Sequence, residues 1–407
     1  MATWVKKFGG SSLATTDRIK HAANLVAKAV KNQHRVVVVV SAMQGETDRL
    51  LSLQQLMTNS GAERESAALI ASGEQVSASL FAMALRDIGI SARSFSGSQA
   101  GIHTTSNYLR AEIQSVDASV FAALPIHTVP VVTGYQGVND GGEVTTLGRG
   151  GSDLSAVAIA HAVGADECQI YTDVDGVFEA DPRILNDAGL IPQLCYSEML
   201  SLASAGAKVL QMRAVEYGAR FSVPLRIKST FNEGEGTLVC PDRAYCGRNR
   251  VVGLGMDQRV ALLHIRSIVN VDAVRLELQE ELDQAGIDID MLTQLPSANS
   301  CSSYDIKFTA SLDDYECVDR IVRALALKHG FDFTATSQCA KISAVGLGLE
   351  YHVSLATELI SLLSQEGMVF DLVQSSASRV SFVLPIIYLR QAASVLYRHC
   401  IRSKVAV

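Results

Sequence analysis

The chain has 407 residues, of which 48% are apolar and 19% charged, and its 35 basic and 42 acidic side chains give a net charge of −7. This balance excludes a disordered chain, and the length predicts two to three domains. No basic block marks a nucleic-acid partner, and neither the longest aliphatic run, residues 36–40, nor the N-terminus predicts a membrane span or a signal peptide.

Residues 1–245 are predicted to form an α/β domain, because short apolar strands alternate with helical segments. The run 35–41 is almost entirely valine, as expected for a strand buried on both faces. Further strands are expected at 4–8, 126–133, 167–172 and, as the last of the domain, 223–229, and helices at 17–31, 63–88 and 153–163. Such alternation predicts a mainly parallel sheet with helices on both faces.

A weak internal repeat begins after about residue 246. Each copy has a helix, a glycine and a strand, followed by a second strand and a second helix. In the first copy these are 272–284, Gly286, 287–294, 304–310 and 313–329, and in the second they are 353–365, Gly367, 368–374, 379–384 and 388–402. An aspartate, Asp290 or Asp371, lies four residues after each glycine. The pattern predicts two βαββαβ units of about 70 residues.

Strand counting suggests how these two units are connected. The first copy has an opening strand at 260–265 and a closing strand at 331–336, whereas the second opens at 341–349 and has too few residues after its last helix for a closing strand. A strand at 250–256 precedes both and has no partner in the first copy. We therefore expect it to complete the second unit, which gives the domains 1–245, 260–338 (inserted), and 250–256 plus 341–407.

The eight cysteines include no C-x-x-C pair and are spread along the chain. They are too sparse for a disulfide scaffold in a protein of this length, so reduced thiols in a cytosolic enzyme are the expected state. We therefore expect a cytoplasmic protein that binds neither nucleic acid nor membrane.

The first candidate motif is Lys7-Phe8-Gly9-Gly10-Ser11-Ser12, directly after a predicted strand and before a helix. Glycines allow a phosphate to approach the backbone closely, and the lysine can neutralise a phosphoryl group in transfer. The alternative is an ordinary strand-to-helix turn with a solvated lysine. The pattern G-x-x-x-x-G-K-[ST] is absent, so a nucleotide site here would belong to another fold than that of the P-loop proteins.

The second motif is Thr146-Leu147-Gly148-Arg149-Gly150-Gly151-Ser152-Asp153, which again leads into a helix. Arg149 offers a bidentate fork to a carboxylate, and the amides of residues 150–152 can surround an anion. Asp153 could orient Lys7, cap the helix, or do both. The alternative is a flexible loop whose aspartate only caps the helix.

The third motif, Ser72-Gly73-Glu74, lies within the long predicted helix 63–88. A glycine inside a helix is unfavourable and needs a reason. Glu74 could fix the amino group of a substrate. The alternative is a helix that starts here, with Glu74 in its first turn.

The fourth motif, residues 171–178 followed by Ala180-Asp181-Pro182-Arg183, comes after a predicted strand, where α/β sheets bind ligands. Its Asp173-Val174-Asp175-Gly176 resembles part of an EF-hand loop, but the glutamate at loop position 12 is missing, which excludes that calcium site. A nucleotide-binding loop and a simple turn remain as alternatives. Ser41 and Thr47 also follow a predicted strand, the valine run.

Taken together and in this order, the motifs resemble those of the aspartate kinases in the amino-acid kinase family. Lys7 to Ser12 resembles the family's K-F-G-G-[TS]-S, Ser72 to Glu74 its S-G-E, Thr146 to Asp153 its T-L-G-R-G-G-S-D, Thr172 to Val177 its T-D-V-D-G-V, and Gly206 to Leu210 its G-A-K-V-L. The second region resembles a pair of ACT domains, which are small ligand-binding modules. The resemblance implies an α/β fold with an amino-acid-kinase-like, mainly parallel sheet between helices, followed by two α+β ACT domains.

The resemblance also implies a reaction, the ATP-dependent phosphorylation of the β-carboxylate of L-aspartate to 4-phospho-L-aspartate, the first step toward lysine, threonine and methionine. Mg²⁺ would bridge the phosphates, but we identify no protein ligand for it. The implied catalytic residues are Lys7 and Asp153; those that hold aspartate are Thr47, Glu74, Arg149 and Ser152; those that line the nucleotide are Lys7, Phe8, Gly9, Gly10, Ser41, Thr172, Asp173, Phe178, Arg183, Lys208 and Val209.

ACT domains imply a homodimer formed through them and an amino-acid effector, here lysine or threonine, with Asp290 and Gln294 as candidate contacts. The effector loops at 268–272 and 350–353 lack the glycine or proline usual in the family, and the β-branched residues in the first loop resist positive φ. We therefore predict weak or absent inhibition by lysine and threonine.

The alternative function is that of an amino-acid sensor whose kinase domain is inactive. The presence of Lys7, Glu74, Arg149 and Asp153 argues against it.

Overall fold

The computed structural model describes residues 1–57, 62–125, 127–207, 209–241, 251–297, 303–349 and 353–402. The chain forms two compact units. The first unit comprises Met1–Val177, Leu190–Ala203 and Lys208–Cys246, and the second comprises Phe178–Gly189, Ser204–Ala207 and Gly247–Val407. Two short segments of the predicted domain 1–245 therefore lie in the second unit.

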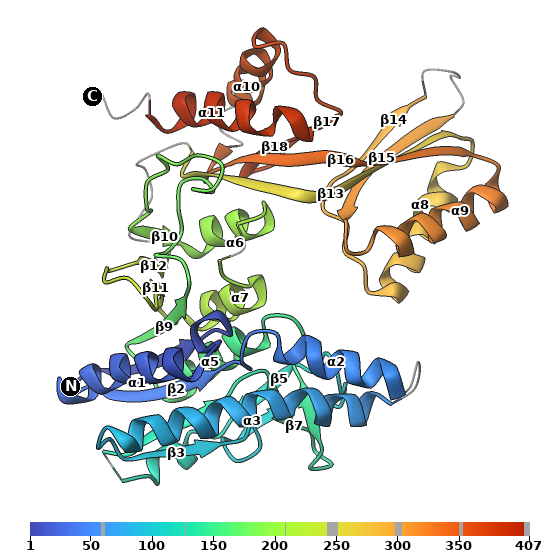
Figure 1. Ribbon diagram of the computed structural model, residues 1–407. Coiled ribbons are helices and arrows are strands. Elements are labelled where there is room, and N and C mark those ends of the chain that lie inside the picture. The colour runs from blue at the N-terminus through green and yellow to red at the C-terminus, as the bar shows by residue number, and fades with distance from the viewer. Residues whose placement is uncertain are drawn as a thin grey trace. The chain divides into compact units, whose positions relative to one another are not determined.

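The first unit is built on an eight-stranded sheet in the order β10-β12-β11-β9-β1-β2-β6-β3 (Figure 1). Its strands are β1 (Thr3–Phe8), β2 (Arg35–Val40), β3 (Ala92–Phe95), β6 (Val129–Thr133), β9 (Glu167–Thr172), β10 (Gln193–Cys195), β11 (Leu225–Ser229) and β12 (Thr237–Cys240). All their pairings are parallel except that of β11 with β12. Because β1 lies between β2 and β9, the first candidate motif leaves the sheet near its centre.

A smaller sheet of four strands, in the order β5-β4-β7-β8, completes the strands of the first unit. Its strands are β4 (Ile102–Thr104), β5 (Ile113–Val116), β7 (Gln136–Val138) and β8 (Val144–Thr146). Strand β8 runs directly into the second candidate motif.

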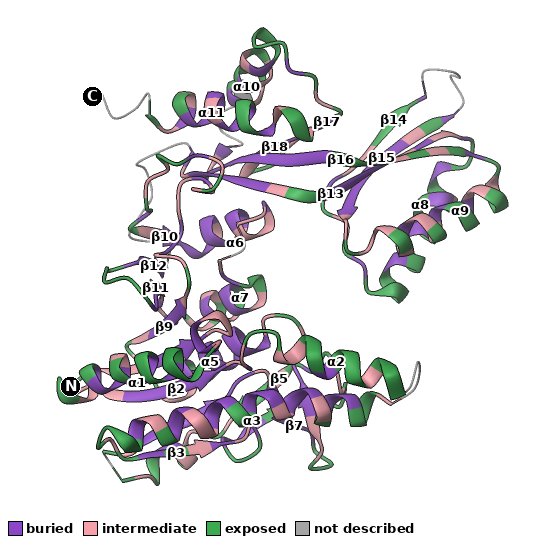
Figure 2. Cartoon of the chain, in the orientation of Figure 1, coloured by how far each residue is buried: buried purple, intermediate pink, exposed green. Residues whose placement is uncertain are grey.

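Helices cover both faces of the large sheet. They are α1 (Thr16–Lys31), α2 (Glu46–Met57), α3 (Glu63–Asp87), α4 (Ser119–Ala122), α5 (Gly151–Ala162), α6 (Tyr196–Ser204) and α7 (Met212–Phe221), with a 3₁₀ turn at Ser11–Leu13. Phe8 and Val38 pack in one core with α1 and α3. Side chains alternate along a strand, so Lys7 faces the opposite side, where α5 lies buried along almost its whole length (Figure 2).

Helix α3 is long and apolar enough, by length and composition alone, to cross a membrane. Half of its most apolar 18-residue window is buried within the protein, however. Phe81 and Leu85 of this window pack against the large sheet, as in an ordinary core helix.

The second unit has a six-stranded antiparallel sheet in the order β14-β15-β13-β16-β18-β17. The strands are β13 (Gly253–Ile268), β14 (Leu292–Pro296), β15 (Tyr304–Ser311), β16 (Asp332–Val345), β17 (Leu372–Ser375) and β18 (Arg379–Pro385); the helices are α8 (Val271–Ala285), α9 (Tyr315–His329), α10 (Val353–Gln365) and α11 (Leu389–Cys400), preceded by a 3₁₀ turn at Ile386–Tyr388. Helices α8 and α9 share one apolar core, whereas α10 and α11 share another.

Most predicted elements of the first unit are confirmed to within two residues, but two strands differ. The strand expected at 126–133 begins at Val129, and 223–229 is not the last strand because β12 follows it. The antiparallel β12 and the short strands of the second sheet are too brief to show a clear period in the sequence.

The second unit corrects the predicted strands in two ways. The strands expected at 250–256 and 260–265 are replaced by one continuous strand, β13 (Gly253–Ile268), and those expected at 331–336 and 341–349 by one strand, β16 (Asp332–Val345). Strands expected at 287–294 and 368–374 begin later, at Leu292 and Leu372. The pairing expected for 250–256 is present, since Gly253–Asp257 pairs with Lys341–Val345.

Candidate active site

Most of the predicted catalytic and aspartate-binding residues line one cavity of the first unit. The cavity has a volume of about 360 Å³ and lies at the carboxyl ends of β1 and β2, beside the N-terminus of α5. The predicted residues that line it are Lys7, Gly10, Ser41, Thr47, Glu74, Ser152 and Asp153. A larger cavity of about 720 Å³ in the same unit is lined by none of the predicted site residues.

Lys7 and Asp153 form an ion pair at the wall of this cavity, with 2.5 Å between Nζ and Oδ1. Both side chains are about nine-tenths buried. The contact is an ion pair rather than a well-aligned hydrogen bond, since Oδ1 has no hydrogen-bond partner within the described ranges. Asp153 does not cap α5, because Gly150 holds the N-cap position with φ +73°. Of the two roles open to Asp153, the structure therefore shows the contact with Lys7.

Gly10 brings bare backbone to the cavity, whereas Gly9 is not among the residues that line it. A Cβ on Gly10 would lie 3.1 Å from the Ala42 carbonyl oxygen, so a side chain there would crowd the neighbouring loop. The Gly9 amide is already used, since it donates to the Tyr171 carbonyl at 3.1 Å. The side chain of Phe8 does not face the cavity but is fully buried and stacks on Tyr171, with 4.8 Å between ring centroids.

Glu74 lies in the middle of α3, which is continuous, so the alternative that a helix starts at this motif is wrong. Gly73 is needed because a Cβ there would lie 3.0 Å from the Cβ of Ala42. The Glu74 Oε1 accepts a hydrogen bond from the Ala42 amide at 3.1 Å, whereas its buried Oε2 has no partner in the described part of the chain. Burial raises the pKa of Glu74 to about 7, and the hydrogen bond from Ala42 only partly opposes it. This carboxylate is therefore unsatisfied in the absence of a ligand.

Side chains from distant elements hold the glycine-rich loop that follows β8. Arg213 Nη1 donates to the Leu147 carbonyl at 2.5 Å. A Cβ on Gly150 would lie 2.3 Å from Cγ of Gln211, so these two residues are in direct contact. Arg149 is exposed and is not among the residues that line the cavity, and no ion pair joins it to another described residue.

The predicted nucleotide residues lie at several places. Thr172 and Asp173 follow β9, where the Thr172 hydroxyl donates to Oδ1 of Asp173 at 3.0 Å. Val209 is half-buried in the first unit. Phe178 and Arg183 belong to the second unit, in which Arg183 is paired with Asp181 at 2.7 Å. Lys208 lies outside the described residues.

The candidate effector residues differ in their surroundings. Asp290 is engaged in ion pairs with Lys341 and Arg379 of the same unit. Gln294 lies on β14 and is exposed. In the loop before α8, the Asn270 side chain caps the helix by accepting from the Ala273 amide at 3.4 Å. Of the second predicted effector loop, 350–353, residues 350–352 lie outside the described residues.

Among the residues that line the cavity and that sequence reasoning missed are Tyr135 and Gln211, besides Gln44, Gly45 and Asp48. Tyr135 has φ +70°, which is unusual for a residue with a side chain, and it packs against the backbone of Gly151. Gln211 borders the cavity just before α7. Tyr135 follows a predicted strand, which was an available signal, whereas nothing near Gln211 in the sequence indicates that it meets the loop at 150.

Among the described residues, no three His, Cys, Asp or Glu side chains come together as a metal site. Mg²⁺ keeps several waters and often binds through substrate phosphates with few protein carboxylates. The donor set is therefore compatible with a magnesium ion that is carried mainly by a nucleotide, and not with a dedicated protein cage.

Comparison with known proteins gives consistent matches. Residues 2–229 match the model of the amino acid kinase family. An aspartokinase of Pseudomonas aeruginosa is 37% identical over 401 residues, which cover 98% of this chain and 97% of that protein, and one of Corynebacterium glutamicum is 37% identical over 402 residues, which cover 98% and 96%. The crystal structure of Escherichia coli aspartokinase III with aspartate and ADP has a similar fold, with TM-score 0.76, 22% identity and coverage of 97% of this chain and 99% of that one.

Proposed function

The chain belongs to the amino acid kinase family and is an aspartate kinase, and we propose on this basis how its first unit transfers the γ-phosphoryl group of ATP to the β-carboxylate of L-aspartate. The observation that carries the proposal is the single cavity that joins the Lys7–Asp153 ion pair to the unsatisfied carboxylate of Glu74. A substrate that carries both an ammonium group and a nucleophilic carboxylate can bind Glu74 through the ammonium and present the carboxylate toward Lys7.

Lys7 acts on the phosphoryl group. The β-carboxylate of aspartate is already ionised at neutral pH, so the reaction needs no general base and depends on positioning and charge neutralisation. The Lys7 ammonium has three donors, and Asp153 occupies one side of it. Asp153 holds the lysine toward the cavity, and the remaining donors stabilise the charge that develops on the phosphoryl oxygens.

Glu74 and Arg149 hold the substrate at its other end. Oε2 of Glu74 accepts from the α-ammonium, which satisfies a buried oxygen that otherwise has no partner. Arg149 binds the α-carboxylate through its planar fork. Thr47 and Ser152 complete the contacts from the two loops that border the cavity. The β-carboxylate is then the end of the molecule left for Lys7 and ATP.

ATP is bound by its phosphates along the backbone of Gly9, Gly10 and Ser41. Mg²⁺, when bound with the nucleotide, would neutralise part of the charge on the phosphates, and we assign no described side chain to hold it. The remaining nucleotide contacts are carried over from the family resemblance alone, and they are Phe8, Thr172, Asp173, Phe178, Arg183, Lys208 and Val209.

The second unit is proposed to contain two ACT modules, 260–338 and 250–256 plus 341–407, which share the long strands β13 and β16. The pairing of Gly253–Asp257 with Lys341–Val345 supports this division. A lysine-bound form is known for E. coli aspartokinase III. For this chain we propose a homodimer through the ACT modules, weak or absent inhibition by lysine or threonine, and a cytoplasmic location.

The test uses trapping of the product. The purified enzyme is incubated with ATP, Mg²⁺, hydroxylamine and either L-aspartate or L-glutamate, and the acyl hydroxamate is measured. We expect β-aspartyl hydroxamate and a kcat/KM for glutamate lower by more than the roughly 10- to 200-fold that one methylene usually gives, since the longer side chain also moves the nucleophile out of line. Comparable kcat/KM values for the two amino acids would overturn the aspartate assignment.

A further inference from the structure

Arg149 lies between two glycines of left-handed conformation in residues 147–151, which we call the Arg149 turn. Gly148 and Gly150 both have φ +73°, and the Gly151 amide donates to the Gly148 carbonyl at 2.9 Å. Such glycines allow the chain to reverse, but they bring no side chains that could fix its direction. Gly150 lines the cavity, whereas Arg149, the residue before it, is exposed. The direction of Arg149 therefore depends on what holds the turn from outside.

The start of helix α7 holds the beginning of the Arg149 turn through Arg213. Its Nη1 donates to the Leu147 carbonyl at 2.5 Å, and its Nη2 donates to the Ala111 carbonyl at 3.4 Å. The Leu147 carbonyl lies only two residues before Arg149. A planar guanidinium that donates to two acceptors fixes direction as well as distance, so Arg213 defines where the turn begins.

The same end of α7 holds the other side of the turn through Gln211. A Cβ on Gly150 would lie 2.3 Å from Cγ and 2.5 Å from Cβ of Gln211, so the glutamine side chain lies directly on bare backbone. Gln211 occupies the N-cap position of α7, but its side chain makes no capping hydrogen bond in this helix as the structure describes it. The side chain of Gln211 therefore supports Gly150, and the residue also borders the cavity.

Helix α7 is itself held firmly within the first unit. A Cβ on Gly218 would lie 3.1 Å from Cδ1 of Leu225 on β11, so the helix lies close against the large sheet. Tyr217, one helical turn after Arg213, packs against the same apolar cluster that contains Leu147. Because protein interiors are close-packed, a helix fixed in this way can hold the residues at its N-terminus in defined positions.

We propose that Arg213 and Gln211 are positioning residues, which hold the Arg149 turn so that Arg149 directs its guanidinium to the α-carboxylate of the substrate. This role rests on the proposed function, in which Arg149 binds that carboxylate. Recognition of the α-carboxylate then depends on the contact between α7 and the turn, and not on Arg149 alone. Neither residue takes part in phosphoryl transfer, so their loss affects the choice of substrate more than the turnover.

The test compares L-aspartate with β-alanine, which is the same molecule without the α-carboxylate. In the wild type we expect kcat/KM for aspartate to exceed that for β-alanine by at least about 100-fold, because β-alanine leaves the guanidinium unpaired. Arg213→Lys keeps the charge but can donate to only one of the two carbonyls in the same geometry. It should lower the ratio by about 5- to 20-fold through the aspartate KM, with kcat within about twofold of the wild type. Arg213→Ala should lower the ratio further.

The matched control is Arg220→Lys, the same change on the same helix. Arg220 is exposed in the last turn of α7, where its guanidinium lies over the Phe221 ring. This variant should leave the ratio within about twofold of the wild type. An unchanged ratio in both Arg213 variants overturns the positioning role. A fall in kcat of equal size for aspartate and β-alanine also overturns it, since Arg213 would then act on the chemical step or on the fold as a whole.

A double-mutant cycle shows whether the effect passes through Arg149. In an Arg149→Ala background, Arg213→Lys should change the ratio by less than about twofold, and equal effects in both backgrounds overturn the route through Arg149. Gln211→Ala, at an exposed position, should follow the same pattern with an effect of about threefold. A wild type that does not distinguish aspartate from β-alanine overturns the proposed role of Arg149 and this one with it. A wild type that distinguishes them, with variants that do so equally well, overturns the positioning role alone.

Discussion

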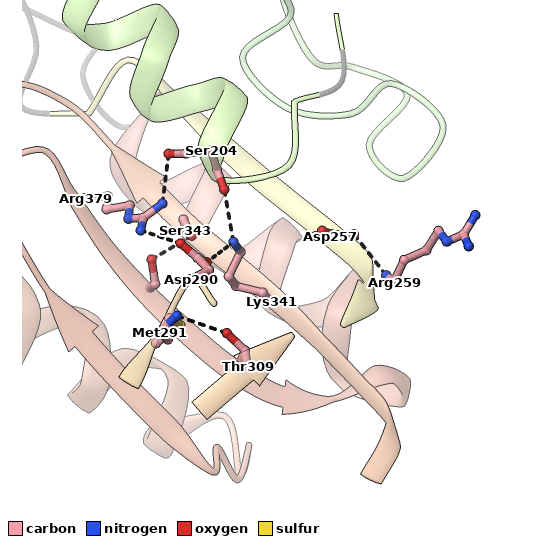
Figure 3. Close-up of polar contacts among 10 residues, drawn as sticks. Ser204, Asp257, Arg259, Asp290, Met291, Thr309, Lys341, Ser343 and Arg379 are labelled. Carbon is pink, nitrogen blue, oxygen red and sulfur yellow. Dashed lines mark hydrogen bonds and ion pairs between the residues drawn. The ribbon is translucent and has the colours of Figure 1, made fainter. Parts of the chain in front are cut away.

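Lys7 in the first unit and Lys341 in the second are both buried lysines paired with an aspartate, and the protein uses them in different ways. Lys7 pairs with Asp153 and otherwise faces a cavity. Lys341 pairs with Asp290 and also donates to the Ser204 carbonyl. An ammonium has three N–H donors. Lys7 therefore retains donors for a ligand, whereas Lys341 uses its donors in contacts within the protein (Figure 3). This difference indicates that a ligand is expected to bind at Lys7 and not at Lys341.

Glu74 extends the same comparison to a carboxylate. Its Oε2 is buried and has no partner among the described residues, and its pKa is raised, whereas the pKa of Asp290 is lowered by two neighbouring cations. A protein tolerates an unsatisfied buried charge mainly where a ligand will satisfy it. Polar groups of the first unit at this cavity thus remain available to a ligand, whereas Asp290 in the second unit is engaged by neighbouring side chains.

Replacing each of the two lysines by an apolar side chain should give the largest difference between a lysine that acts on a ligand and one that stabilises the fold. Lys7→Ala should lower kcat by about 10²- to 10³-fold, because its charge acts in the transition state, and should also lower the melting temperature, because Asp153 is left buried without its cation. Lys341→Met should leave kcat nearly unchanged and lower the melting temperature by roughly 5–10 °C, as expected for a loss of about 2–3 kcal/mol in a unit of this size. Steady-state kinetics and thermal unfolding of both variants check this. The same profile for both variants would remove the distinction.

Arg149 should affect binding more than chemistry. Arg149→Ala loses a bidentate contact with the α-carboxylate, which should raise the aspartate KM by about 10- to 100-fold at nearly unchanged kcat. Arg149→Lys should recover only part of this, because a lysine cannot form the fork. Initial rates over a range of aspartate concentrations give both constants. A fall in kcat without a change in KM would show that Arg149 acts on the phosphoryl group instead.

Glu74 should make aspartate binding depend on pH. With its pKa near 7 in the free enzyme, Glu74 is mostly protonated below that pH and lacks the negative charge that pairs with the ammonium. We therefore expect kcat/KM for aspartate to rise with pH by up to tenfold per unit below pH 7 and to level off above it. Glu74→Gln should abolish this dependence and weaken binding. A profile that is flat between pH 6 and 8 in the wild type would contradict the role of Glu74.

The raised pKa of Glu74 also has a consequence for stability. The folded protein holds a proton on Glu74 that the unfolded chain releases between pH 4.5 and about 7, so this group lowers stability as pH rises through that window. Glu74→Gln removes the charge and should raise the melting temperature at pH 8 relative to the wild type, but much less at pH 5. Thermal unfolding at the two pH values measures the difference. An equal shift at both would mean that the charge is not what destabilises the site.

Lys6 gives the smallest expected effect. It is buried on the opposite side of β1 from Lys7 and donates to the Tyr171 hydroxyl at 2.9 Å. Burial, with a smaller contribution from Lys228, lowers its pKa to about 7. Because the unfolded chain then binds more protons between pH 7 and 10.5, stability from this group rises with pH over that range. Lys6→Met should therefore stabilise the protein at pH 7, by less at pH 10, and leave kcat within twofold. Thermal unfolding at both pH values checks this, and destabilisation at pH 7 would show that the bond to Tyr171 outweighs burial.

The sequence predicted which residues lie at the cavity better than it predicted the side-chain contacts that surround the cavity. Lys7 and Ser41 lie at strand ends, and a parallel sheet gathers such positions at one edge, whereas Glu74, in the middle of α3, was identified through its motif. The contact of Gln211 with Gly150 depends on side chains 61 residues apart and leaves no local signal. No sequence pattern likewise indicates that Arg149 forms no ion pair with another residue in the described part of the chain.

In the second unit the sequence indicated the elements but not their continuity. Gln258 and Arg259 are exposed in the middle of β13, at a register shift, so the strand appeared in the sequence as two. Ser337 and Gln338 produce the same effect in β16. Polar residues on an exposed stretch of a long strand have the composition of a turn.

The most direct measurement is a structure of the enzyme with L-aspartate and ADP. The account predicts the α-ammonium within about 3.2 Å of Glu74 Oε2, the α-carboxylate on Arg149, and the β-carboxylate toward Lys7 and the nucleotide. An aspartate bound in the reverse sense, with its α-carboxylate at Lys7, or bound with Glu74 Oε2 still unpartnered, would contradict it.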